Sequence, residues 1–305
     1  MPCHWLLRLG VSAMVRIICA VLLIGPLASQ AASHPSIAYV KVVTPETVAH
    51  TCTVDLTNPS VKVSVALAKG GVGSSERFKS MIGRTQPIAA ITGTFFDTRS
   101  LLPTGDIALF GTLVHSGCIG SALCIDSANR ATIVPLAAGR KTRWSDYETV
   151  LCAGPTLLAD GKIAIAIRHE GFRGSLYCRN RRTAVGITKA GKLLLVVVNR
   201  KASLYDVAKL MMRLNVVDAV SLDGGSSTAF YHDGRYFAMP FRKLTNCLVV
   251  YASPQDYQRA KSALAPSELF TRAQVDRSTA PSAGFILGQL LPPGILSDLI
   301  LPPPH

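Results

Sequence analysis

Apolar and polar residues alternate along several short stretches of the chain, with the two-residue period of a half-buried β-strand. The alternation is clearest at residues 48–56, and it returns at 61–67 after the turn Asn58-Pro59. Short continuous apolar runs predict buried strands, and glycine-containing turns between two apolar runs predict hairpins. The predicted strands are 48–56, 61–67, 88–96, 216–222 and 248–251, and the predicted hairpins are 157–167, 183–198 and 228–239.

Three segments are predicted helices, and two of them, 204–214 and 74–82, have apolar residues on one helical face. The strongest is 204–214, where Ser203 followed by Asp206 supplies a variant of the capping box. The other two predicted helices are 74–82, with Ser74 or Ser75 as its N-cap, and 254–265. Because strands outnumber helices, we expect an α+β fold: a single strand-rich domain with a mixed or antiparallel sheet and a few packed helices.

The two ends of the chain differ in character from this middle part. Arg8 and Arg16 precede an apolar run at 17–27, and small residues follow at 28–32. That run is too short to cross a bilayer, so we expect a cleaved signal peptide at 1–31 rather than a retained anchor, and a secreted or periplasmic protein. The expected domain is 36–253, followed at 254–305 by a helix and a proline-rich, poorly ordered tail.

Six cysteines remain after such a cleavage, and an even number in an exported chain predicts disulfides. Cys118 and Cys124 are the favoured pair, because Gly117 and Gly120 allow the loop between them to close. The other pairings stay open. No C-x-x-C motif or cysteine and histidine cluster is present, so neither a metal site nor a cofactor is expected.

The formal net charge is +14, which favours anionic partners such as phosphorylated glycans or an envelope surface. The basic residues form no stripe interleaved with aromatic residues and no nucleic-acid motif. Nucleic acid is therefore not an expected partner, whereas peripheral contact with the envelope or a membrane surface is.

The candidate chemistry centres on Ser221-Leu222-Asp223-Gly224-Gly225-Ser226-Ser227-Thr228, where an apolar strand runs into two glycines and three hydroxyl residues. Glycines there permit positive φ and let backbone N–H groups approach a ligand, an arrangement that suits phosphate. The segment lacks the second glycine of a nucleophile elbow and the lysine of a P-loop. A tight turn with no chemical role is the alternative.

Three further segments favour a functional site over a turn with no chemical role. They are Thr92-Gly93-Thr94-Phe95-Phe96-Asp97, Gly154-Pro155-Thr156 and Arg181-Arg182-Thr183. In this order, and followed by the segment at Asp223, they resemble the phosphodiester glycosidase family over about residues 48–251. That family includes an enzyme that removes N-acetylglucosamine from a phosphodiester on mannose, and exported bacterial members related to exopolysaccharide. Two positions depart from its pattern: Thr92 replaces an asparagine, and Ser226 follows two glycines rather than three.

The resemblance implies a role for each motif residue. Asp223 would be the catalytic carboxylate or would hold sugar hydroxyls, and Arg182 would bind phosphate through its forked guanidinium. The expected substrate contacts are Gly224, Gly225, Ser226, Ser227, Thr92, Gly93, Phe95 and Phe96. Glycosidases usually use two carboxyl groups, and the candidates for the second are Asp97, Asp106 and Glu170. Asp97 is placed with Asp223 and Arg182 in the expected catalytic group.

The expected function is therefore that of an exported hydrolase that cleaves the glycosidic bond of a sugar-1-phosphate diester. The expected substrate contains an N-acetylglucosamine-like sugar or is a polysaccharide of the cell envelope. The alternative is a non-catalytic module that binds anionic surface polysaccharide, which the basic charge also favours. A metal-dependent phosphodiesterase would need clustered aspartate and histidine ligands that the sequence does not display.

Overall fold

The structure is a computed structural model, and it describes residues 34–44, 47–117, 119–136, 143–172 and 174–269. The expected signal peptide and most of the C-terminal tail lie outside these residues. The domain bounds and the export of the chain therefore stay predictions.

Three antiparallel sheets make up the described part of the chain. The first sheet has the order β1 (Ile37–Val43), β2 (Val48–Val54), β13 (Leu193–Ala202), β12 (Asn180–Thr188), β14 (Val216–Leu222), β10 (Thr156–Ala159) and β11 (Lys162–Ile163). The second has the order β16 (Arg235–Ala238), β15 (Phe230–His232), β4 (Ala89–Thr92), β17 (Asn246–Tyr251) and β3 (Lys62–Leu67). The third has the order β6 (Thr112–His115), β5 (Ile107–Leu109), β9 (Tyr147–Cys152), β7 (Ser121–Asp126) and β8 (Ala131–Pro135).

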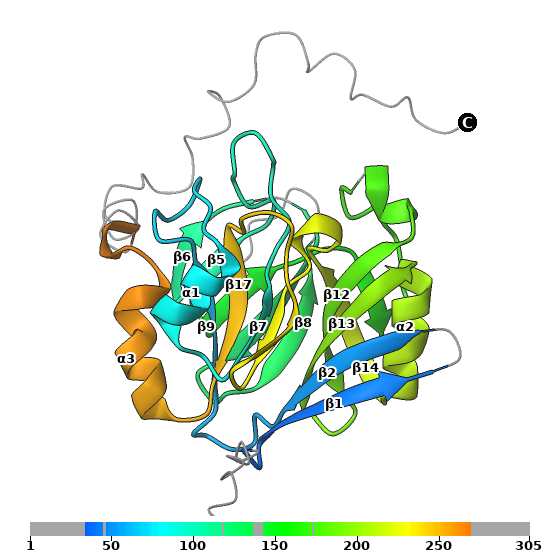
Figure 1. The fold of residues 1–305 in the computed structure, drawn as a ribbon, viewed down its shortest axis with the longest axis horizontal. Coiled ribbons are helices and arrows are strands. Elements are labelled where there is room, and N and C mark those ends of the chain that lie inside the picture. The colour runs from blue at the N-terminus through cyan, green and yellow to red at the C-terminus, as the bar shows by residue number, and fades with distance from the viewer. Residues whose placement is uncertain (1–33, 45–46, 118, 137–142, 173, 270–305) are drawn as a thin grey trace, which may run out of the picture. The chain divides into compact units, whose positions relative to one another are not determined.

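Helices cover the outer faces of the first two sheets (Figure 1). Helix α2 (Leu204–Arg213) packs against β12, β13 and β14, whereas α1 (Phe78–Thr85) and α3 (Pro254–Leu264) pack against β17 and its neighbours. Two short 3-10 turns, η1 (Gly174–Tyr177) and η2 (Gly225–Ser227), complete the set. Among the helices in the described residues, none is long and apolar enough to cross a membrane.

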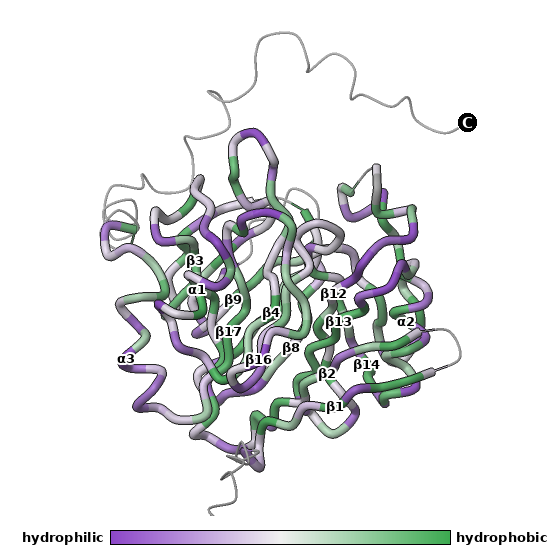
Figure 2. The backbone as a smooth tube through the Cα atoms, in the orientation of Figure 1, coloured by the Kyte–Doolittle hydropathy of each residue, from purple (hydrophilic) through white to green (hydrophobic). Residues whose placement is uncertain are grey.

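The inner faces of the three sheets share one hydrophobic core. Strand β13 shows how the sequence divides between two layers, because its successive side chains point to opposite faces. Leu193, Leu195 and Val197 enter the shared core, and the residues between them pack under α2. Figure 2 shows β17 and the first part of β13 as hydrophobic, whereas α3 alternates between hydrophobic and hydrophilic residues. Both faces of β17 and of residues 193–198 in β13 are buried, so these stretches are continuous apolar runs.

The predicted fold class is confirmed: the chain is a strand-rich α+β protein with antiparallel sheets and few helices. Helix α2 begins as predicted, with both hydrogen bonds of the capping box between Ser203 and Asp206. The predicted start of α1 is wrong, because the helix begins at Phe78. The Ser74 hydroxyl instead donates to the carbonyl of Gly71, and Glu76 pairs with Leu244 in an isolated bridge, so this segment stays extended.

The cysteines do not pair among the described residues, where all five are free thiols. Cys52 and Cys247 pack as small apolar side chains in two separate clusters, and Cys124 shares a third with Cys152. Burial raises the pKa of the Cys124 thiol to about 12. The favoured partner of Cys124 in the sequence prediction, Cys118, lies outside the described residues.

The ends of β4 and β14 meet through backbone contacts that leave no room for a side chain. The N–H of Asp223 donates to the carbonyl of Gly93 (3.0 Å), which joins the strand ends directly. On the other side of Gly93 lies Asn246, and a Cβ added to Gly93 would stand 1.8 Å from its Oδ1 atom. That Oδ1 atom accepts a hydrogen bond from the N–H of Thr94 (2.9 Å), so it cannot move freely. Gly93 is therefore required by close approach.

We expect Gly93→Ala to lower the free energy of unfolding by about 2 kcal/mol, because the new methyl group overpacks the Asn246 side chain. Gly83→Ala is the matched control: Gly83 is a residue of α1, and nothing lies within 4 Å of the added Cβ. The control should gain about 0.5 kcal/mol from its higher helix propensity. Urea unfolding of the two variants and the wild type measures both changes. Equal effects of the two substitutions would show that the strand ends are not tightly joined.

Candidate active site

The turn after β14 brings a carboxylate and several backbone N–H groups to one place. Gly224 is extended, and a Cβ there would lie 2.7 Å from the carbonyl oxygen of Arg181; Gly225 follows with φ of +58°. These two glycines let the chain fold into η2 against the start of β12. Within the described residues, the N–H groups of Gly225 and Ser226 donate no hydrogen bond. They are free to bind an anion.

Asp223 is a partly buried carboxylate at the start of this turn. Burial raises the pKa of Asp223 to about 6, against the opposing effects of the Ser227 hydroxyl, the Arg242 charge and the N–H of Gly224. A carboxyl group with a pKa near neutrality can give or take a proton at physiological pH. Asp223 therefore has the electrostatic character of a catalytic acid or base.

Arg182 lies beside this turn, at a bulge near the start of β12. Its side chain is 4% exposed, and it donates to the carbonyls of Ala202 (Nε, 3.1 Å), Leu176 (Nη2, 3.0 Å) and Cys178. Burial lowers the pKa of Arg182, and no carboxylate of the described residues forms an ion pair with it. Arg182 thus fastens the η1 segment to the sheet and adds an uncompensated positive charge to the site.

Arg242 is the second cation of the site, and it reaches Asp223 from the loop after β16. Its guanidinium lies over the ring of Phe96, with 4.6 Å between the guanidinium carbon and the ring centroid. Its charge acts on Asp223, where it opposes the rise in pKa. No carboxylate of the described residues pairs with Arg242 within ion-pair distance. A cation–π contact orients this guanidinium without consuming its hydrogen-bond donors.

These side chains line one cavity of about 360 Å³, within the usual range for small-molecule sites. One part of its wall is aromatic and apolar, where the rings of Phe95 and Phe172 lie 5.3 Å apart. The other part is polar and positively charged. The lining residues are Phe95, Phe96, Thr98, Thr104, Phe172, Leu176, Asn180, Arg182, Asp223, Gly224, Gly225, Ser226, Ser227 and Arg242.

Most of the predicted site residues line this cavity, but three do not. Thr92 and Gly93 stand behind it in the second sheet, where Thr92 pairs with Cys247. Asp97 is exposed, and its carboxylate accepts from the N–H groups of Ser100 (2.7 Å) and Arg99 (3.0 Å). These bonds, the Ser100 bond first, hold the pKa of Asp97 below its usual value. The structure thus brings Asp223 and Arg182 together and leaves Asp97 in a loop turn.

The other two candidates for a second carboxylate are also engaged away from the cavity. Asp106 accepts from the N–H of Gly117 (2.7 Å) and from the indole of Trp144 (2.5 Å). Glu170 accepts from the N–H of Thr156 (2.9 Å), and burial raises its pKa. In the part of the chain that the structure describes, Asp223 is the one carboxylate that lines the cavity.

The sequence reasoning missed Arg242, Asn180 and Phe172. Asn180 lies against the turn, where a Cβ on Gly225 would stand 3.1 Å from its Nδ2 atom. Arg242 stands in the run Met239-Pro240-Phe241-Arg242-Lys243, whose adjacent arginine and lysine after a hairpin are the one local signal for it. Phe172 has no such signal, because only the fold brings it to Phe95.

The arrangement combines a titratable carboxylate with cations and N–H donors that suit a phosphate, and with aromatic rings that suit a sugar face. Among the described residues, no group of three or more histidine, cysteine, aspartate or glutamate side chains gathers to hold a metal ion. The site therefore has the features of a pocket for a phosphorylated sugar on a strand-rich α+β scaffold.

The comparisons with known proteins agree with this class. Residues 85–251 match the family model of the phosphodiester glycosidases, and the chain belongs to that family. No curated protein matches the sequence at a significant level.

Three solved structures share the fold. The catalytic domain of zebrafish N-acetylglucosamine-1-phosphodiester alpha-N-acetylglucosaminidase, described as auto-inhibited by its pro-peptide, has a TM-score of 0.57 and 23% identity over 70% of this chain and 81% of its own. A protein from Burkholderia pseudomallei K96243 described as exported has a TM-score of 0.56 and 16% identity, over 67% of this chain and 74% of its own. A protein from Synechocystis has a TM-score of 0.55 and 14% identity, over 70% and 61%.

We expect Asp223→Asn to stabilise the folded protein at pH 8 and to leave its stability unchanged at pH 4. The folded protein holds the Asp223 proton more tightly than the unfolded chain does, because its pKa is about 6 rather than the ordinary value near 4. The carboxyl thus contributes to stability below about pH 4, and this contribution is lost as the pH rises to about 6. The gain of the variant at pH 8 should be on the order of 2 kcal/mol in urea unfolding.

Asp97→Asn is the control with the opposite sign. The pKa of Asp97 is lowered in the folded protein, so its ionised form contributes to stability above the unfolded value and the contribution is lost on acidification. This variant should be less stable than the wild type at pH 8. If Asp223→Asn also lost stability at pH 8, the ionised carboxylate would be a stabilising partner of the arginines. It would then not be a group whose burial in the ionised form destabilises the fold.

Proposed function

We propose that the chain is an exported hydrolase that cleaves the bond between the anomeric carbon of a sugar and a phosphodiester oxygen. The observation that carries this proposal is the position of Asp223: its carboxylate, with a pKa of about 6, lines a cavity whose other charged residues in the described chain are arginines. An anionic substrate needs those positive charges, and its hydrolysis needs a group that accepts a proton from water.

The phosphate fits the polar part of the cavity. Among the described residues, the guanidinium of Arg242 and the N–H groups of Gly225 and Ser226 have no hydrogen-bond acceptor, and Arg182 adds a buried positive charge. Charge-assisted hydrogen bonds of this kind are about twice as strong as neutral ones. The sugar then lies toward Phe95, Phe172 and Leu176, whose apolar surfaces can contact the C–H groups of a pyranose ring.

In the proposed step, water attacks the anomeric carbon while the bond from that carbon to the phosphate oxygen breaks. The ionised carboxylate of Asp223 accepts a proton from the water, and the bonding electrons leave with the phosphate. The products are the free sugar and a phosphate monoester, and the proton passes from Asp223 to solvent. The second pKa of such a monoester is near 6, so it leaves without prior protonation. This accounts for a glycosidase site in which one carboxylate suffices.

The comparisons support the class of substrate and the cellular location that we propose. The zebrafish enzyme acts, by its name, on an N-acetylglucosamine phosphodiester, and the Burkholderia pseudomallei protein is described as exported. We propose an N-acetylglucosamine-like sugar phosphodiester or an exopolysaccharide of the cell envelope as the substrate, and a secreted or periplasmic location.

Release of reducing sugar from the methyl diester of N-acetylglucosamine-1-phosphate tests the reaction. We expect Asp223→Asn to lower kcat/KM at least about a hundredfold, the usual contribution of a general base. In the wild type, kcat/KM should rise as the pH increases through about 6, because the base must be ionised. Saturable, salt-sensitive binding of an anionic glycan with no turnover of any diester would instead favour the non-catalytic binding module.

The two arginines should respond differently to substitution. Arg242→Ala should lower kcat/KM with little loss of stability, because the contact of its guanidinium within the described residues is the ring of Phe96. Arg182→Ala should also destabilise the fold by about 2 kcal/mol or more, since three carbonyls lose their buried donor. Thermal unfolding beside the kinetic assay separates the two effects. Equal stability of the two variants would contradict the structural role of Arg182.

A further inference from the structure

A second hollow lies beside the candidate active site and shares Arg242 with it. We call it the basic groove. It has a volume of about 400 Å³, and it runs between the start of α1 and the loop that follows β16. Its lining residues are Arg77, Phe78, Lys79, Met239, Pro240, Phe241, Arg242 and Lys243.

Positive charge in the basic groove is not compensated. Its four cations, Arg77, Lys79, Arg242 and Lys243, form no ion pair with any carboxylate of the described residues. The neighbouring carboxylate of Glu76 is already bound to the Arg84 guanidinium at 2.7 Å. Such a concentration of one sign of charge in a concave surface attracts anionic ligands.

The groove also exposes apolar surface between its charges. Phe241 is 82% exposed and Met239 is more than a third exposed, and so is Tyr236, which lies beside the groove against Phe78 and Lys79. The Lys79 ammonium lies 5.6 Å from the centre of the Tyr236 ring. Aromatic side chains with open faces pack against sugar rings, whereas the cations between them bind charged substituents. The groove thus has the mixed surface that a charged glycan requires.

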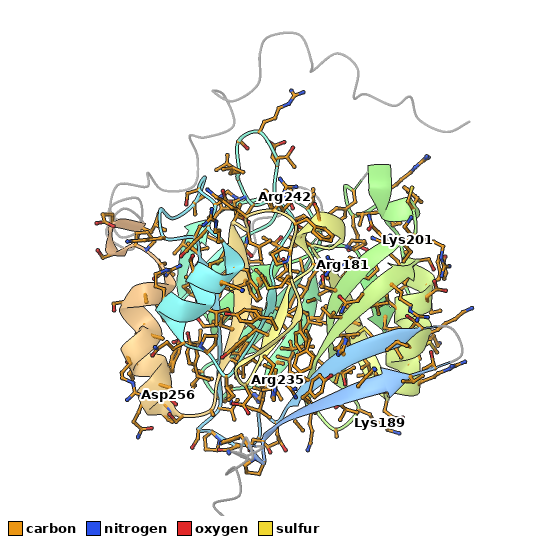
Figure 3. All side chains as sticks on the ribbon, viewed as in Figure 1. Arg181, Lys189, Lys201, Arg235, Arg242 and Asp256 are labelled. Carbon is orange, nitrogen blue, oxygen red and sulfur yellow. The ribbon has the colours of Figure 1, made fainter. Side chains whose placement is uncertain are left out.

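The wall between the groove and the cavity is held in place by the site itself. The N–H of Phe241 donates to the carbonyl of Ser226 (2.8 Å), and Arg181 donates to the carbonyl of Met239 (3.1 Å). The Arg181 guanidinium also lies over the Phe241 ring, 5.0 Å from its centre. Figure 3 labels Arg181 below Arg242 in the view. A ligand that contacts this wall is therefore positioned relative to Asp223.

We propose that the basic groove is the subsite for the part of the substrate beyond the phosphate, and that this part is an anionic glycan chain. The inference rests on the proposed function, because it starts from a phosphate beside Arg242. The sugar that is released lies toward Phe95, so the chain on the other side of the phosphate leaves the cavity past Arg242. Three further cations there match a chain with repeated negative charges. A lipid phosphate has no such repeat and would leave them unused.

The test uses one variant of the full chain that removes three exposed cations and keeps Arg242, which belongs to the cavity. That variant is Arg77→Ala, Lys79→Ala and Lys243→Ala combined. Its kcat/KM is compared with that of the wild type on three N-acetylglucosamine-1-phosphate diesters. Their second alcohols are an oligogalacturonate, a neutral oligomannose of equal length, and a polyprenol. Binding of free oligogalacturonate is measured by calorimetry in parallel.

We expect about a tenfold loss of kcat/KM on the oligogalacturonate diester, and less than a twofold loss on the other two. Each exposed ion pair multiplies affinity by at most about fivefold, and several act together here. The loss should disappear at high salt, which screens exposed charges. Thermal unfolding should be unchanged, because the three side chains are exposed.

A control variant matches the charge change at sites that do not line the groove. It combines Lys162→Ala, Lys189→Ala and Arg235→Ala, which again removes two lysines and one arginine from exposed positions. In Figure 3, Lys189 and Arg235 lie in the lower part of the view, away from Arg242. This control should behave like the wild type on all three diesters.

The outcomes distinguish the groove from the reaction. An equal loss on all three diesters, a loss confined to the polyprenol diester, or a loss shared with the control variant would overturn the anionic glycan as the occupant. If the wild type turned over none of the diesters, the proposed function would fail, and calorimetry would still decide the groove. Oligogalacturonate binding that depends on Arg77, Lys79 and Lys243 would keep it as a glycan site, and its absence would end the proposal.

Discussion

The close approach of strand ends from two different sheets is the constraint on which the rest of the structure depends. The hydrogen bond from the N–H of Asp223 to the carbonyl of Gly93 joins β14 to β4 at the rim of the cavity. A side chain at position 93 would stand where Asn246 already lies, and a side chain at position 224 would meet the carbonyl of Arg181. The glycines therefore serve packing first. The loops that follow these two strands supply part of the cavity lining, and the segment from Phe172 to Arg182 and the loop after β16 supply the rest.

The two arginines of the cavity differ in how their hydrogen-bond donors are used. A buried guanidinium is costly unless its donors are occupied, and Arg182 meets this requirement with the main-chain carbonyls of Leu176, Cys178 and Ala202. Its charge then remains uncompensated, because carbonyl groups are dipoles and not anions. Arg242 is more exposed and rests on an aromatic ring, so its donors stay available to a ligand. Arg182 therefore holds the cavity wall in place, whereas Arg242 can bind an anionic ligand.

Local patterns in the sequence predicted what local forces determine. The alternation of β2 and β3 and the capping box at Ser203 depend on near neighbours, and the structure confirms them. The third sheet was missed, because its strands are short, and β5 for example pairs with β9 across a long loop. The Asp223 turn was found from its glycines. Arg242 and Phe172 were missed because their place in the cavity depends on long-range contacts. The sequence around Asp97 did not show that its carboxylate binds the N–H groups of its own turn.

The position of Asp223 also bears on the choice between an enzyme and a binding module. A surface that only binds an anionic glycan is weakened by a carboxylate among its cations, because the ionised group repels the ligand. Here Asp223 lines the cavity, and burial raises its pKa to about 6. An asparagine at this position would remove both the cost of burying the carboxylate and its repulsion of an anionic ligand. The Ser227 hydroxyl and the Arg242 charge favour its ionised form. A carboxyl group with a pKa near 6 beside two arginines is a poor element of a surface that only binds anions, whereas it suits a group that exchanges a proton.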